Sequence, residues 1–115
     1  MELKPSLRAL RQNCGAIASA VVSRDGLVIA ADVPEGVSME TFGIMCATLM
    51  GAASTAHSEL RAGTPQRVIV ESEDTKMVLV GAGRKALIVA VIGRKGDITQ
   101  AIKKLDEMAE MIKLI

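Results

Sequence analysis

The sequence has almost no aromatic residues: it holds no tryptophan and no tyrosine, and Phe42 is its single phenylalanine. Proteins that bind single-stranded nucleic acid usually stack the bases on aromatic side chains, and this chain offers no such platform. The 14 basic and 13 acidic residues are spread along the chain and form no basic stripe. We therefore predict that nucleic acid is not a partner.

Cysteine is also scarce, with only Cys14 and Cys46, which lie far apart in apolar segments. This spacing excludes a CxxC redox pair and a zinc cluster, and it predicts two buried free thiols in a reducing compartment.

The N-terminal stretch MELKPSLRALRQN alternates charges with leucine and lacks the apolar run of a secretion signal. We expect a cytoplasmic protein.

A long, strongly apolar run is missing as well. Residues 39–56 are the one candidate for a membrane span, but they include Glu40 and several hydroxyl residues and are rich in alanine and glycine. Spanning helices usually need about 20 strongly apolar residues. The sequence therefore predicts no membrane insertion.

The 115 residues suit a single domain, residues 1–115, with one core. Apolar spacing predicts a short helix over residues 4–13, ended by Gly15, and a long helix from a Ser38 cap to about Arg61. A third helix begins at Asp97, where Asp97 and Gln100 have capping-box spacing, and its apolar face extends to Ile115. Strand patterns cover residues 16–22, 27–31, 67–73, 77–80 and 86–92.

The loops between these strands are short, which requires antiparallel neighbours. Strands 16–22 and 86–92 are apolar on both faces, so we place them in the middle of a sheet with helices above and below. The stretch RVIVESE, residues 67–73, carries charges at both ends and suits an edge.

Two glycine-containing segments are candidates for phosphate sites. Gly81, Gly83 and Ala86 match the letters of a dinucleotide fingerprint, but a strand follows them where the mechanism needs a helix, so a hairpin turn is favoured. GRKGD, residues 93–97, opens a helix but lacks the other features of a phosphate-binding loop, which leaves anion binding there as the weaker alternative.

No catalytic group emerges from the sequence. The single histidine, His57, has no orienting acid on its own helix face, and a structural or interface role is favoured. Glu71 and Glu73 share one side of a predicted strand and are better explained as solvated edge charges than as an acid–base pair. We predict a protein that is not an enzyme, with no cofactor and no metal.

The long helix is apolar on more than one side. One face can pack on the sheet through Phe42, Cys46, Leu49, Met50, Ala53 and His57. A second side carries small residues four apart, which we name the small-residue ridge: Gly43, Ala47, Gly51 and Thr55. Either the chain's own helices cover this ridge or a partner helix does, and two glycines inside a helix favour the second copy of a homodimer.

The predicted edge strand supports self-association independently. If RVIVESE pairs antiparallel with its own copy about Ile69 or Val70, Arg67 lies opposite Glu71 or Glu73 of the other chain. Opposite charges across such a pair contribute about 0.2 to 1 kcal/mol each. The predicted dimer interface therefore consists of the small-residue ridge together with Arg67, Ile69, Glu71 and Glu73.

Four stretches stand out along the chain: the run GAIASAVVSRDGLVIAAD, the long small-residue helix with HSEL near its end, and the segments RVIVESEDTKMVLVGAG and ALIVAVIG. Together they resemble the Roadblock family, also called dynein light chain Roadblock-type. The likeness extends from about Leu3 to the C-terminus, and VVSRDGLVIA is its most specific part. The resemblance implies an α+β, profilin-like sandwich with a five-stranded antiparallel sheet, the long helix on one face and the terminal helices on the other. The element order is α-β-β-α-β-β-β-α.

The resemblance also implies a function. Roadblock proteins dimerise through the second helix and third strand and act as regulators or scaffolds of small Ras-like GTPases. We expect a homodimeric, non-catalytic module of this kind, whose partner-binding face includes Met45, Thr48, Ala52 and Glu59. The alternative is a small-ligand sensory domain of a related sandwich fold, with a pocket between the sheet and a helix.

Overall fold

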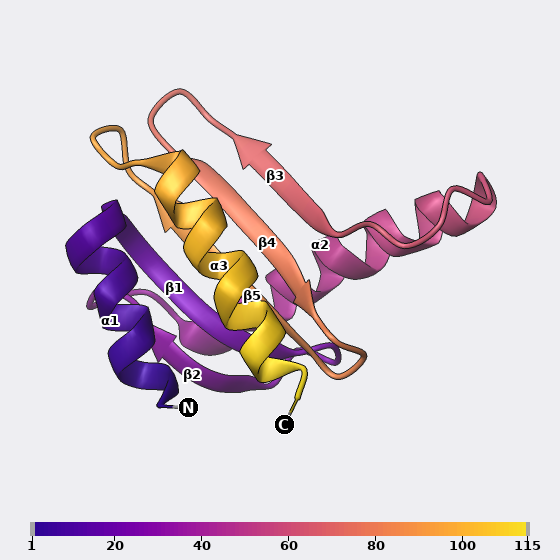
Figure 1. Cartoon of the computed structure of the whole chain (residues 1–115), viewed down its shortest axis with the longest axis horizontal. Coiled ribbons are helices and arrows are strands. Elements are labelled where there is room, and N and C mark those ends of the chain that lie inside the picture. The colour runs from indigo at the N-terminus through magenta and orange to yellow at the C-terminus, as the bar shows by residue number, and fades with distance from the viewer. Residues whose placement is uncertain (1, 115) are drawn as a thin grey trace.

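A computed structural model describes residues 2–114, so the predicted apolar position Ile115 lies outside the described residues. The elements follow the expected order (Figure 1). The helices are α1 (Leu3–Cys14), α2 (Met39–Glu59) and α3 (Ile98–Ile112). The strands are β1 (Ala16–Ser23), β2 (Val28–Asp32), β3 (Arg67–Glu71), β4 (Lys76–Ala82) and β5 (Ala86–Ile92).

The five strands form one antiparallel sheet in the order β2-β1-β5-β4-β3. The prediction that the two fully apolar strands lie inside the sheet is confirmed, because β5 is central and β1 is its neighbour. The prediction that residues 67–73 form an edge is also confirmed, although β3 ends at Glu71. It ends there because Ser72 starts a tight turn, in which its backbone N–H donates to the carbonyl oxygen of Thr75 at 2.9 Å.

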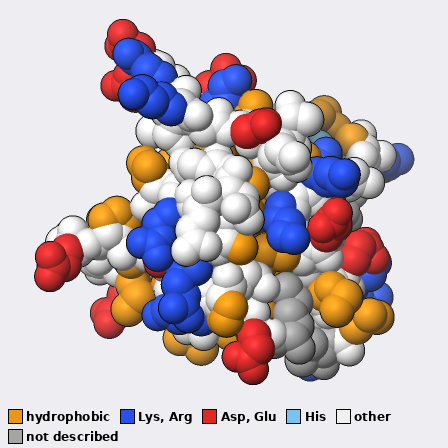
Figure 2. Space-filling view, turned by 60° about the vertical axis from the view of Figure 1, so that its left-hand side comes forward, with side chains coloured by type: hydrophobic (Ala, Val, Ile, Leu, Met, Phe, Trp, Pro, Cys, Tyr) orange, Lys and Arg blue, Asp and Glu red, His pale blue; other side chains and the backbone are white. Residues whose placement is uncertain are grey.

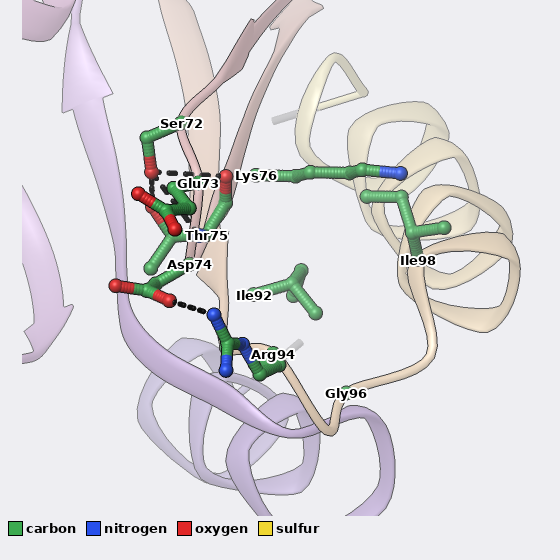
Figure 3. A pocket seen from close by; sticks show the side chains of 10 residues that line it. Ser72, Glu73, Asp74, Thr75, Lys76, Ile92, Arg94, Gly96 and Ile98 are labelled. Carbon is green, nitrogen blue, oxygen red and sulfur yellow. Dashed lines mark hydrogen bonds and ion pairs between the residues drawn. The ribbon is translucent and has the colours of Figure 1, made fainter.

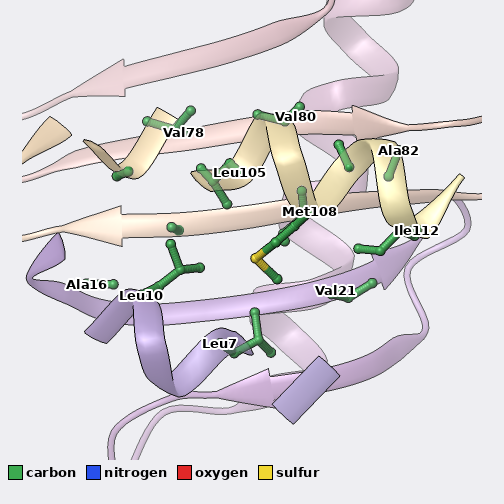
Figure 4. Close-up of a cluster of buried hydrophobic side chains, with 14 of the residues drawn as sticks. Leu7, Leu10, Ala16, Val21, Val78, Val80, Ala82, Leu105, Met108 and Ile112 are labelled. Atoms are coloured by element: carbon green, nitrogen blue, oxygen red, sulfur yellow. The ribbon is translucent and has the colours of Figure 1, made fainter. Parts of the chain in front are cut away.

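Helices cover both faces of the sheet. Helices α1 and α3 lie side by side on one face, where Leu7 and Leu10 of α1 and Leu105 and Met108 of α3 pack on strand residues such as Val21 (Figure 4). Helix α2 lies on the other face, where Cys46 and Met50 pack on Leu79, Leu87 and Val89. Both clusters consist of buried side chains, so the centre of each interface between a helix layer and the sheet is filled.

The helix ends follow from local chemistry. Gly15 ends α1 in the left-handed conformation, with φ at 75°, which glycine adopts without a Cβ clash. Ser38 caps α2, because its side chain accepts a hydrogen bond from the N–H of Thr41. Asp97 caps α3 through the N–H of Gln100, while its own N–H donates to the carbonyl of Cys14. The predicted capping box is therefore only half formed, since the end of α1 takes the second bond.

Candidate interaction surface

Helix α2 keeps apolar side chains on the side that faces away from the sheet. Ile44 and Met45 are 50% and 53% exposed, and Met39 is also exposed. Leu49, which we predicted to pack on the sheet, is 38% exposed and borders this surface instead. The C-terminal part of α2 and the loop after it project past β3 (Figure 1). The described chain therefore leaves much of its most apolar helix uncovered.

The small-residue ridge is divided between two environments. Gly43 is buried, and a Cβ atom at Gly43 would lie 2.7 Å from Cγ2 of Val28 and 3.3 Å from the carbonyl oxygen of Gly26. Ala47 is likewise buried in the cluster between α2 and the sheet. The close approach that we assigned to a partner helix is thus made with the chain's own β1–β2 hairpin, which removes Gly43 and Ala47 from the predicted interface.

The other half of the ridge is open. A Cβ atom at Gly51 would meet nothing within 4 Å, and Thr55 is exposed. The residues predicted to bind a partner also lie at the surface: Met45, Thr48, Ala52 and Glu59 are all exposed. Thr48 satisfies its hydroxyl locally by donating to the carbonyl of Ile44 at 2.8 Å. This side of α2 is therefore mainly apolar, with a few polar side chains among the apolar ones.

The edge strand β3 is the second part of the predicted interface. Ile69 is 45% exposed and Val70 is 39% exposed. An apolar sheet edge of this kind can pair with a strand of another chain. Arg67, predicted to lie opposite an acid of a second chain, donates within its own chain from Nη2 to both carboxylate oxygens of Asp106, at 2.9 and 2.8 Å. The two residues are 39 positions apart, so sequence spacing gave no sign of this pair.

Glu71 and Glu73 are not on one face of a strand as predicted. Glu71 ends β3, whereas Glu73 lies in the β3–β4 turn. The turn faces the β5–α3 loop across a pocket of about 170 Å³, in which Asp74 accepts an ion-paired hydrogen bond from Arg94 (Figure 3). Acidic and basic side chains line this pocket together, and the Asp97 carboxylate already occupies the start of α3. The arrangement disfavours a bound anion at residues 93–97.

The remaining candidate residues lie in a hairpin turn or contact their own helix, and none of them forms part of a catalytic or metal-binding group among the described residues. The β4–β5 hairpin contains Gly81, Gly83 and Ala86. This confirms the predicted hairpin turn, which we favoured over a dinucleotide-binding site. His57 is half-buried, and its Nδ1 lies 3.0 Å from the carbonyl oxygen of Ala53 on the preceding turn. Within residues 2–114, no three His, Cys, Asp or Glu side chains come together as a metal site.

Both cysteines are buried free thiols, as predicted. Burial raises the pKa of the Cys46 thiol to about 11. The pKa of Cys14 is raised by burial first and by the negative charge of Asp97 second, against the opposing charge of Lys104. Each thiol therefore stays protonated at neutral pH and behaves as a small apolar side chain.

The surface around α1 carries no dominant charge. Basic, acidic and small apolar patches are interspersed on the face shown in Figure 2. Among the described helices, none is both long enough and apolar enough to cross a bilayer. The apolar side of α2 and the exposed edge of β3 differ from this mixed face, because exposed apolar side chains gather there.

Most of the chain matches a known protein family. The sequence model of the Roadblock/LC7 domain matches residues 6–92. The chain belongs to the Roadblock/LC7 family. Two relatives are the uncharacterized proteins MJ0310 and MJ1340 of Methanocaldococcus jannaschii, each 37% identical over 83 residues, which cover 72% of this chain and 73% of theirs.

Solved structures confirm the predicted profilin-like fold. A Roadblock/LC7 domain from Streptomyces avermitilis superposes with a TM-score of 0.88 at 18% identity, covering 99% of this chain and 97% of that one. MglB of Myxococcus xanthus gives 0.88 at 9% identity, with coverages of 96% and 84%. Profilin II of Acanthamoeba castellanii gives 0.67 at 20% identity, with 97% of both chains covered. This Roadblock domain therefore shares its architecture with profilin.

Proposed function

We propose that two copies of this Roadblock domain pair through α2 and the free edge of β3, and that the dimer is a non-catalytic regulatory or scaffold module for a small Ras-like GTPase in the cytoplasm. The observation that carries the proposal is the uncovered apolar side of α2, where Ile44 and Met45 are half exposed. Family membership supports a regulatory role connected with small GTPases.

The described contacts sharpen the proposed interface. On α2 it includes Gly51 and Thr55, which are open, and omits Gly43 and Ala47, which are buried against the sheet. Because β3 covers only Arg67–Glu71, an antiparallel β3–β3 pair is centred on Ile69 and sets Arg67 beside the partner copy's Glu71. Arg67 then shares its charge between that glutamate and Asp106 of its own chain. A standard interface takes about 800 Å² from each partner, and we propose that both elements contribute to it.

Sedimentation of Gly51→Leu tests the dimer. A leucine side chain at the open Gly51 would hold two α2 helices apart, so we expect the variant to sediment as a monomer or to precipitate. An unchanged, soluble dimer would remove Gly51 from the interface, and a monomeric wild-type protein would overturn the dimer itself.

Binding of a GTPase is tested with the purified, immobilised protein. Extract from its own cells, loaded with either GDP or a non-hydrolysable GTP analogue, is passed over it, and retained GTPases are identified by mass spectrometry and then re-tested in purified form. We expect Met45→Asp to lose this binding and Met111→Asp, at an equally exposed methionine on α3, to keep it. Retention of no GTPase in either nucleotide state would contradict the proposal.

The alternative of a small-ligand sensory domain required a pocket between the sheet and a helix. In the described chain, buried side chains fill the centres of both spaces, and the pockets that remain lie at the rims, beside β3 and between β2 and the start of α2. Neither pocket accounts for the uncovered apolar side of α2, which a regulatory module explains. The regulatory module is therefore the function that we put forward.

A further inference from the structure

A cavity of about 460 Å³ opens beside β3, on the same side of the sheet as α3. Helix α3 lies over β4 and β5 and leaves β3 uncovered, which creates the space (Figure 1). Its lining combines an apolar floor with polar walls. Val80 and Ala109 are buried beneath it, Pro65 and Gly81 border it, and two arginines from separate parts of the fold, Arg24 and Arg67, reach it.

The two guanidinium groups are only partly used by the protein. Arg24 donates from Nη2 to the carbonyl of Gly83 at 2.7 Å, and Arg67 donates from Nη2 to Asp106. The Nε atom of each arginine is buried and has no hydrogen-bond partner among the described residues. Buried donors normally find a partner, so both guanidinium groups are incompletely bonded. The two Nε atoms are shielded from solvent, so an acceptor in the cavity would bind the Nη atoms.

The lining of the cavity holds two arginines and two acids, and Arg24 is the member of these four that has no ion-pair partner among the described residues. Asp106 is paired with Arg67, and Glu110 is paired with Lys113 at 2.8 Å. Arg24 has no carboxylate within 4 Å among the ion pairs of residues 2–114. A carboxylate fits this unpaired arginine, because it carries one negative charge and two coplanar oxygens that match the fork of a guanidinium group. A phosphate group carries more charge than this arginine would balance.

We propose that this cavity binds a single carboxylate group through Arg24 and Arg67, with a short aliphatic tail lying on Val80, Ala109 and Pro65. The carboxylate belongs either to a small free acid or to an acidic side chain of a protein partner, which present the same head group. The site lies on the opposite side of the sheet from α2, but it shares Arg67 with the proposed β3–β3 pair, in which the partner copy's Glu71 would compete for that arginine. Arg24 takes no part in that pair.

Amide NMR titrations of the intact protein test the site. Butyrate represents a free acid, N-acetyl-glutamate N-methylamide represents a protein side chain, and butyramide is the neutral control. We expect saturable shifts at Gln66, Gly81, Gly83 and Ala109 with at least one carboxylate, and none with butyramide. The tighter of the two acids identifies the source of the carboxylate.

Variants establish which groups recognise the ligand. Arg24→Gln removes a charge-assisted hydrogen bond, so affinity should fall about tenfold or more. Arg94→Gln, at an exposed arginine on the far loop, should change affinity less than about twofold, because solvent and salt screen its charge. Arg24→Lys, which keeps the charge but not the fork, should bind with intermediate affinity.

The contact of Arg24 with Gly83 means that Arg24→Gln can also disturb the fold, which its amide spectrum reveals. Gly81→Ala then provides the test, because its Cβ would lie 2.8 Å from Nη2 of Arg24 and displace the guanidinium group. Equal shifts with butyramide, full affinity in both Arg24→Gln and Gly81→Ala, or no saturation by about 10 mM of either acid would each overturn the proposal.

Discussion

Two glycines on one helix, about two turns apart, have opposite surroundings. Gly43 allows α2 to approach the β1–β2 hairpin, where a methyl group would clash with Val28. Gly51 has open space around it in the described chain. Glycine costs about 1 kcal/mol relative to alanine inside a helix, so each position has to be explained by what the missing side chain permits.

Alanine substitutions should separate the two glycines. Gly43→Ala should lower the free energy of unfolding by about 1 to 3 kcal/mol, because it overpacks a buried contact. Gly51→Ala should leave the folded protomer intact and favour the helix by about 0.5 to 1 kcal/mol. Urea denaturation of both variants at one protein concentration checks this, and equal effects at the two sites would contradict the described packing.

The buried Cys46 thiol should make stability depend on pH in the alkaline range. Its pKa is raised from 9.0 to about 11, so the folded state keeps a proton that the unfolded state loses first. The stabilising contribution is complete below pH 9 and is lost as the pH rises towards 11, by about 1 to 2 kcal/mol after allowance for solvent screening. The chain has no tyrosine to titrate in the same range.

The pH dependence is measured by urea denaturation between pH 7 and 11 on the wild type and on Cys46→Ala. The variant loses a buried side chain and is less stable throughout, but its stability should fall less steeply above pH 9. Parallel curves for the two proteins would show that Cys46 titrates normally.

At the scale of elements, much of the fold could be predicted from the sequence. The order of helices and strands, the interior position of β1 and β5 and the edge position of β3 follow from apolar patterning and short loops. The environment of the small-residue ridge could not be predicted, because a glycine on an apolar helix looks the same whether it faces its own sheet or a partner. The Arg67–Asp106 pair was missed because it joins β3 to α3, which are distant in the sequence.

Helix capping at α3 gives an element-scale prediction. Asp97 accepts a hydrogen bond from the N–H of Gln100, so Asp97→Ala should destabilise the protein by about 1 kcal/mol. Glu2 occupies the equivalent position before α1 but makes no side-chain capping bond, so Glu2→Ala should change stability by less than about 0.5 kcal/mol. Thermal unfolding followed by circular dichroism compares them, and a larger loss for Glu2→Ala would argue against capping by Asp97.

At the scale of the whole molecule, α2 and the edge of β3 would form one continuous dimer surface. The protomer leaves Ile69 half exposed at the sheet edge, and a second copy would cover it. The proposed pairing would join two five-stranded sheets through their β3 strands, which is one way in which proteins protect an apolar edge.

An isoleucine pair tests this arrangement. Ile69→Asp should weaken self-association by about tenfold or more, because two carboxylates would face each other at the centre of the β3–β3 pair. Ile17→Asp places the same charge at a similarly exposed isoleucine on β1, away from that edge, and should leave association unchanged. Concentration-dependent sedimentation distinguishes the two, and equal association of both variants would place the interface elsewhere.

The pairing of β1 with β5 also has a consequence for synthesis. The centre of the sheet joins the first strand to the last, with Ser23 opposite Ala86. During translation, β1, β2 and all of α2 leave the ribosome before β5 exists, and the apolar side chains of α2 then have no completed sheet to cover them. The nascent chain is consequently most prone to aggregate just before Ala86–Ile92 emerges, and interrupted products that lack this strand are expected substrates for chaperones and proteases.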